Sequence, residues 1–141
     1  MKLLVINGAN VNMLGVIDPE KYGTATYKDL EEHVKVVAKS YEIEAENFHS
    51  NSECEIVDKI QSAYKKFDGI IINAGSYRDT SAAIPDALKA VGIPAVSVRL
   101  DEGPVSERTF EVNEIYEASF SGEGFVSYKK AVEFFSQKSK N

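Results

Sequence analysis

Cysteine, histidine and tryptophan are scarce in this chain of 141 residues, which has one cysteine, two histidines and no tryptophan. Because Cys54 is the single thiol, a framework of intrachain disulfides is excluded. His33 and His49 are too few to build a Cys/His zinc site with that thiol, so we expect no bound metal. These absences exclude the disulfide-stapled and zinc-ribbon classes of small protein.

Long apolar runs are also missing. No stretch approaches the roughly 18–20 apolar residues that a membrane-spanning helix needs. The apolar start of the chain is too short for a secretory signal peptide and lacks a small-residue cleavage site. We therefore expect a cytoplasmic protein with no membrane partner.

Basic residues are outnumbered as well, because 16 Lys and Arg face 22 Asp and Glu, which gives a net charge of −6. Binding to a nucleic-acid backbone needs clustered Lys and Arg, so no nucleic-acid partner is expected. The net charge does not exclude a pocket for a small molecule.

What remains is an ordinary globular composition, with 43% hydrophobic and 27% charged residues. A chain of this length fits one core, so we expect a single domain over residues 1–141. The polar tail at 136–141 is expected to be frayed.

Strand-like and helix-like patterns alternate along the sequence. Thr26 is an N-cap candidate, and Ser52 with Glu55 forms the pattern of a capping box. Alternating strands and helices predict βαβ units and a parallel sheet, hence an α/β fold. Strands are expected at 3–6, 43–48, 69–73, 95–100 and near 118–121, with helices at 26–41, from 52, at 81–91 and at 125–137.

Ligands of parallel sheets bind at the carboxyl ends of the strands. These ends fall here at 7–12, 48–51, 73–80 and 99–103. Asn7, Asn10 and Asn12 at the first end could hold a polar ligand or a water, although asparagine alone more commonly stabilises turns. His49 at the second end is interpreted as a structural hydrogen-bonding residue rather than a catalyst.

Several of these strand ends carry motifs of one enzyme family. Residues 7–15, NGANVNMLG, resemble the N-G-P-N-L-N-L-L-G signature of type II 3-dehydroquinate dehydratases, with Ala9 in place of proline. Further resemblance to that family lies at 18–23, 51–53, 71–75 and 80–87, in register from Leu3 to about Leu100. Beyond Leu100 the resemblance weakens.

The resemblance implies a flavodoxin-like three-layer sandwich with a central parallel sheet of about five strands. It also implies dehydration of 3-dehydroquinate to 3-dehydroshikimate without a cofactor, in a homo-oligomer built on trimers, up to a dodecamer. Tyr22 would match the phenolate base, Asn10 the residue that holds the catalytic water, and Asn73 a ligand of substrate hydroxyls. Asp86 would match a residue that reaches the neighbouring subunit's site. The remaining positions that would line the substrate site are Asn12, Asp79, Arg99, Leu100 and Asp101.

The chain departs from the family pattern at the positions that perform the chemistry. The family's lid arginine is Ile17, its glutamate is Ser97 and its general-acid histidine is Arg99. An unperturbed tyrosine titrates near pH 10, and a cation at about 4 Å would favour its phenolate by roughly 4 kcal/mol at an effective dielectric of 20. Arg78, Arg99 and Arg108 are the candidates to replace that cation.

Other departures change the charge of the expected pocket. Asp79 replaces a histidine, and Asp101 with Glu102 replaces a neutral Ser-Asn pair. These acids would repel a substrate carboxylate, so a neutral or zwitterionic ligand is expected to bind better. Arg99 could instead form an internal ion pair with Asp79 or Asp101, which would leave the net charge of the site near zero.

Three functional hypotheses follow. The first is a diverged homologue with lost or altered catalysis that binds or acts on a small polar molecule. The second is an active 3-dehydroquinate dehydratase with rearranged catalytic groups. The third is a non-catalytic regulatory or structural assembly partner.

Overall fold

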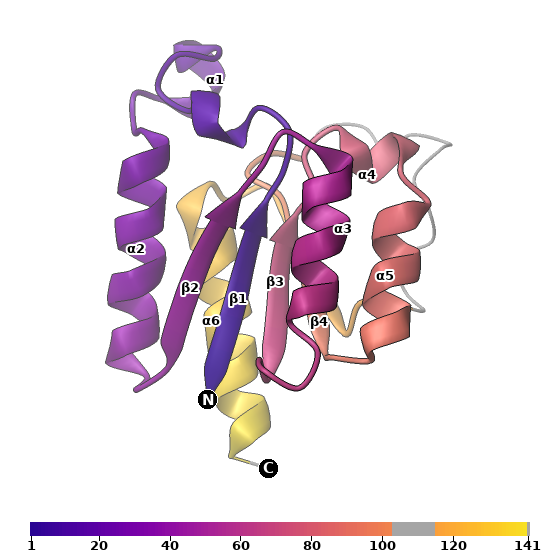
Figure 1. Cartoon of the computed structure of the whole chain (residues 1–141). Coiled ribbons are helices and arrows are strands. Elements are labelled where there is room, and N and C mark those ends of the chain that lie inside the picture. The colour runs from indigo at the N-terminus through magenta and orange to yellow at the C-terminus, as the bar shows by residue number, and fades with distance from the viewer. Residues whose placement is uncertain (103–114, 141) are drawn as a thin grey trace.

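Five parallel strands form one sheet between two layers of helices in the computed structural model, which describes residues 1–102 and 115–140 (Figure 1). The strand order is β2-β1-β3-β4-β5. This is the flavodoxin-like order, so the fold expected from the sequence is confirmed. The strands are β1 (Lys2–Asn7), β2 (Glu44–His49), β3 (Gly69–Asn73), β4 (Ala95–Val98) and β5 (Ala118–Phe120).

The central strands read as continuous apolar runs because helices cover both faces of the sheet. On one face, α2 (Tyr27–Ser40) and α6 (Phe125–Ser139) pack on a core that includes Val5 and Phe135. On the other face, α3 (Glu53–Ser62) and α5 (Ala83–Val91) pack on a second core that includes Ile6 (Figure 1).

Two of the long helices begin at predicted caps. The Thr26 side chain accepts a hydrogen bond from the Asp29 amide, and the Asp29 carboxylate accepts one from the Thr26 amide, so α2 starts with a complete capping box. The capping box predicted for Ser52 is only half formed. Ser52 Oγ accepts from the Glu55 amide at 3.3 Å, but the Glu55 carboxylate accepts instead from the Ser50 hydroxyl.

The carboxy-terminal end of the chain is more ordered than its composition suggests. Helix α6 continues to Ser139, and Ser136 is buried. The expectation of a frayed tail is therefore corrected for residues 136–139. Tyr128, Val132 and Phe135 recur on the buried face of α6, and this packing holds the polar residues in the helix.

Short helices form at the carboxyl edge of the sheet: the 3₁₀ turn Val11–Met13, α1 (Pro19–Tyr22) and α4 (Tyr77–Thr80). The loops after β1 and β3 approach closely there, since the Gly8 amide donates to the Asn73 carbonyl at 2.7 Å. A Cβ at Gly8 would lie 2.4 Å from the Ala74 carbonyl oxygen, so only glycine fits. This contact sets Asn10 and Asn73 beside the same opening.

Across the described residues, no helix has both the length and the apolar character that crossing a bilayer requires.

Candidate active-site cleft

A cleft of about 280 Å³ opens at the carboxyl edge of the sheet, where the sequence predicted a site. It lies between the loop after β1, helix α1, helix α4 and the residues that follow β4. The volume suits a small organic molecule. The residues that line it are Ala9, Asn10, Val11, Leu14, Ile17, Tyr22, Asn73, Gly75, Ser76, Arg78, Asp79, Arg99, Leu100 and Asp101.

Asn73 forms part of the floor of the cleft and is fixed by hydrogen bonds beneath it. Its Oδ1 accepts from the Gly75 amide at 3.1 Å, and its Nδ2 donates to the Tyr128 hydroxyl at 2.9 Å. The Tyr128 hydroxyl in turn donates to Oδ1 of the buried Asn7. Burial raises the pKa of Tyr128, so this hydroxyl keeps its proton and can donate.

Asn10 lies at the mouth of the cleft in the left-handed backbone region, with φ of 70°. Its amide donates to Asn51 Oδ1 at 2.9 Å, which ties the loop after β1 to the loop after β2. The Tyr77 hydroxyl donates to the Asn51 carbonyl at 2.7 Å. Residues from three strand ends thereby fix the mouth of the cleft.

Tyr22 is held against Asp101. The Tyr22 hydroxyl donates to Asp101 Oδ2 at 3.1 Å, and Lys21 Nζ lies 2.8 Å from the same oxygen. Burial acts to raise the pKa of Asp101, but the hydrogen bonds from Lys21 and Tyr22 and the charge of Arg99 outweigh it and lower that pKa. Asp101 is thus a carboxylate at neutral pH.

Two guanidinium groups line the cleft with two carboxylates. Arg99 Nη2 lies 3.6 Å from Asp101 Oδ1, and Arg78 Nε lies 4.0 Å from Asp79 Oδ1. Burial and the nearby Arg99 lower the pKa of Arg78, but a guanidinium remains protonated near neutral pH. Among the described residues that line the cleft, the two arginines carry as much positive charge as the two aspartates carry negative charge. A nearly neutral lining is the result expected if Arg99 pairs with Asp101.

Arg99 has donor capacity left over. Its Nε is buried without a hydrogen-bond partner in the described part of the chain. Ile17, at the position of the family's lid arginine, also lines the cleft and contributes no charge.

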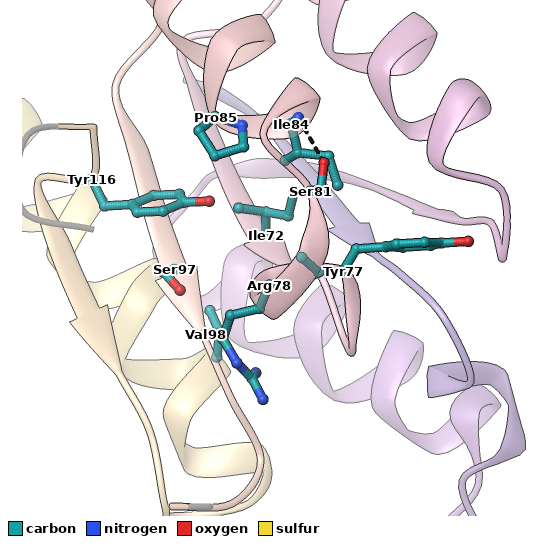
Figure 2. A pocket seen from close by; sticks show the side chains of 10 residues that line it. Ile72, Tyr77, Arg78, Ser81, Ile84, Pro85, Ser97, Val98 and Tyr116 are labelled. Atoms are coloured by element: carbon teal, nitrogen blue, oxygen red, sulfur yellow. Dashed lines mark hydrogen bonds between the residues drawn. The ribbon is translucent and has the colours of Figure 1, made fainter. Parts of the chain in front are cut away.

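A second cavity of about 30 Å³ lies under α4, between β3, β4 and α5 (Figure 2). Ser97 lines it, and the Tyr116 side chain extends toward Pro85 and Ile72 (Figure 2). The volume is enough for about one water molecule, so this cavity is no site for an organic ligand. Arg78 borders both cavities, and its guanidinium points away from Ser81 and Pro85 (Figure 2).

The structure separates the predicted site residues into two groups. The cleft brings together Tyr22, Asn10, Asn73, Asp79, Arg99, Leu100 and Asp101. Asn12 is exposed in the 3₁₀ turn and does not line the cleft, so its assignment as a ligand-binding residue stays a prediction.

Asp86 is exposed in the first turn of α5 and does not line the cleft of its own chain. Glu102 was expected to repel a ligand carboxylate, but its side chain lies against Gly122. Arg108, the third candidate to replace the lid arginine, lies outside the described residues.

His49 has a structural environment. Its Nε2 lies 3.2 Å from the Gly8 carbonyl, its ring packs against Tyr27 with centroids 5.4 Å apart, and it does not line the cleft. Burial lowers the pKa of His49 and favours the neutral ring, whose N–H can donate to that carbonyl. Within residues 1–102 and 115–140, no three His, Cys, Asp or Glu side chains gather as a metal site.

Lys21, Asn51 and Tyr128 support the site but were not predicted from the sequence. Lys21 and Asn51 lie within the matched segments 18–23 and 51–53, so their position in those segments was the available signal. Tyr128 lies 121 residues from Asn7 and was visible only as an apolar position of the last helix.

Comparison with known proteins agrees with the motifs. The model of the class II dehydroquinase family matches residues 1–136. A 3-dehydroquinate dehydratase of Hydrogenovibrio crunogenus is 42% identical over 133 residues, which cover 92% of each chain. One from Fusobacterium nucleatum is 53% identical over 103 residues, covering 71% of this chain and 70% of the relative.

Among solved structures, a type II dehydroquinase from Butyrivibrio crossotus superposes with a TM-score of 0.88 at 38% identity, covering 95% of this chain and 96% of that one. The family match, the near-full-length relative and this superposition agree on both fold and sequence. The chain therefore belongs to the type II dehydroquinase family.

Proposed function

We propose that this chain binds a small polar molecule in the cleft and does not dehydrate 3-dehydroquinate efficiently. The relatives are named 3-dehydroquinate dehydratase, so the cleft is compared with what that reaction requires. In that reaction, as the motifs imply, Tyr22 would remove a proton from carbon and a histidine would protonate the leaving hydroxyl. The arrangement of the cleft opposes both steps.

One observation carries the proposal: the Tyr22 hydroxyl donates a hydrogen bond to the Asp101 carboxylate at 3.1 Å. A base at this position must exist as a phenolate. A phenolate there would lie beside the Asp101 carboxylate, and like charges at such close range repel each other. Lys21 offsets only part of this repulsion because its side chain is 49% exposed and already pairs with Asp101.

The second step lacks a proton donor. Arg99 stands at the position of the family's histidine, and a guanidinium does not release its proton near neutral pH. No imidazole lines the cleft among the described residues. The joint change at the base and at the acid therefore disfavours the dehydration.

An active dehydratase with rearranged groups is the second candidate, and two observations favour it. Relatives of that name match over almost the whole chain, and Arg78 lines the cleft, where it could stand in for the missing lid arginine. A purely structural or regulatory assembly partner has less support, because such a role needs no open cleft.

A steady-state assay of the purified protein tests the proposal by following the absorbance of the conjugated enone product, with the Hydrogenovibrio crunogenus relative as the positive control. We expect no turnover above background at neutral pH. A turnover number of about 1–1000 per second, the usual range for enzymes, would contradict it. Calorimetry with 3-dehydroquinate then asks whether the cleft binds the compound without converting it.

A further inference from the structure

The carboxylate of Asp101 lies among three donor groups from two parts of the chain. Lys21 and Tyr22 of α1 lie within 2.8 Å and 3.1 Å of Oδ2, and Arg99 Nη2 lies 3.6 Å from Oδ1. An ammonium, a hydroxyl and a guanidinium are the groups with which proteins bind ligand carboxylates. In this chain the Asp101 carboxylate itself takes the place that a ligand carboxylate could take beside these donors.

A ligand carboxylate that entered the cleft would therefore find these donors already paired with Asp101. It would have to displace Asp101 from Arg99 and Lys21, or bind beside a carboxylate whose side chain is only 24% exposed. Like charges at close range oppose binding, and partial burial weakens the screening that would relieve it.

Asp101 also joins the two walls of the cleft. The bond from Tyr22 connects helix α1 to the residues that follow β4. The buried Nε of Arg99 has no partner among the described residues, so the guanidinium keeps a donor for a second acceptor. Removal of the Asp101 charge would leave Arg99 and Lys21 without their anion.

We infer that Asp101 sets the charge specificity of the cleft: it acts as an internal carboxylate that excludes carboxylate ligands and admits uncharged polar ones. This rests on the proposed function, since it names the ligand class for the same cleft. It concerns binding alone, so the dehydratase assay decides the proposed function separately.

The test uses two probes that differ in one charge, quinate and its uncharged methyl ester, in calorimetric titrations of the wild-type protein and Asp101→Asn. Asparagine preserves the size of the side chain and removes the charge. We expect wild type to prefer the ester, and Asp101→Asn to bind quinate about tenfold or more tightly than wild type does. Glu102→Gln is the matched control, because it removes the same charge one residue away, where the side chain packs against Gly122.

Three results would overturn the inference. Wild type could bind quinate as tightly as the ester, Asp101→Asn could gain no affinity for quinate, or Glu102→Gln could gain as much as Asp101→Asn. Circular dichroism checks the fold of each variant. Should Asp101→Asn not fold, Asp101→Ser removes the same charge in a smaller side chain, and the same gain for quinate is required of it.

Discussion

The hydroxyl of Tyr128 joins the floor of the cleft to the hydrophobic core, so its removal should destabilise the protein measurably. Tyr128 is 1% exposed, accepts from Asn73 Nδ2 and donates to Asn7 Oδ1. In Tyr128→Phe both asparagines lose that partner. Asn7 is fully buried, and its Oδ1 would lose the hydrogen bond that the Tyr128 hydroxyl donates.

Each buried polar group left without a partner costs about 1–3 kcal/mol. The two asparagines share one hydroxyl, so we expect a combined loss of about 2–4 kcal/mol in the free energy of unfolding. For a domain of this size that corresponds to a fall of about 6–12 °C in the melting temperature.

Thermal unfolding followed by circular dichroism measures this effect. Tyr64→Phe is the control, since its side chain is 54% exposed and the loss of its hydroxyl should change stability by less than about 0.5 kcal/mol. If Tyr128→Phe melted within about 2 °C of wild type, the hydrogen bonds under Asn73 would not contribute as argued.

Two further predictions concern pH and assembly. Burial raises the pKa of both Tyr27 and Tyr116 to about 12, so the unfolded chain loses these protons first. The contribution of these two tyrosines to stability should be constant below about pH 10, and stability should fall as the pH rises from 10 to 12. Urea unfolding at pH 8 and pH 11 measures this fall, which Tyr116→Phe should reduce, and equal midpoints for wild type would contradict it. We also expect an oligomer built on trimers, with Asp86 at a subunit interface. Light scattering that returned the monomer mass of 15.6 kDa would refute this.

The fold was predictable because its signals are local. The apolar runs of β1 and β3 and the helical spacing of Leu30, Val34 and Val37 each mark an element within one short window. The half-formed cap at Ser52 was not predictable, because Ser50 takes the Glu55 carboxylate. The order of residues 136–139 likewise depends on the packing of α6 against the sheet, which the composition of the tail does not record.

The position of the cleft was predictable, but the pairing of its side chains was not. The strand-end rule and the family motifs brought Asn10, Tyr22, Asn73 and Arg99 to one cleft. The hydrogen bond from Tyr22 to Asp101, 79 residues away, joins α1 to the residues that follow β4, and no local pattern encodes a contact over that sequence distance.

Asn12 shows that a motif match does not by itself place a residue in the cleft. It matches the family motif, but within one chain the 3₁₀ turn leaves it exposed and outside the cleft.

A single-turnover experiment tests most directly whether this cleft has lost the dehydration reaction. The protein is mixed in excess with 3-dehydroquinate at neutral pH, so that slow product release cannot hide the chemical step, and the enone absorbance is followed. Because Tyr22 is hydrogen-bonded to Asp101 and no imidazole lines the cleft among the described residues, we predict no conversion above the uncatalysed rate. Conversion at about 1 per second or faster would place the chain among ordinary enzymes and contradict the account.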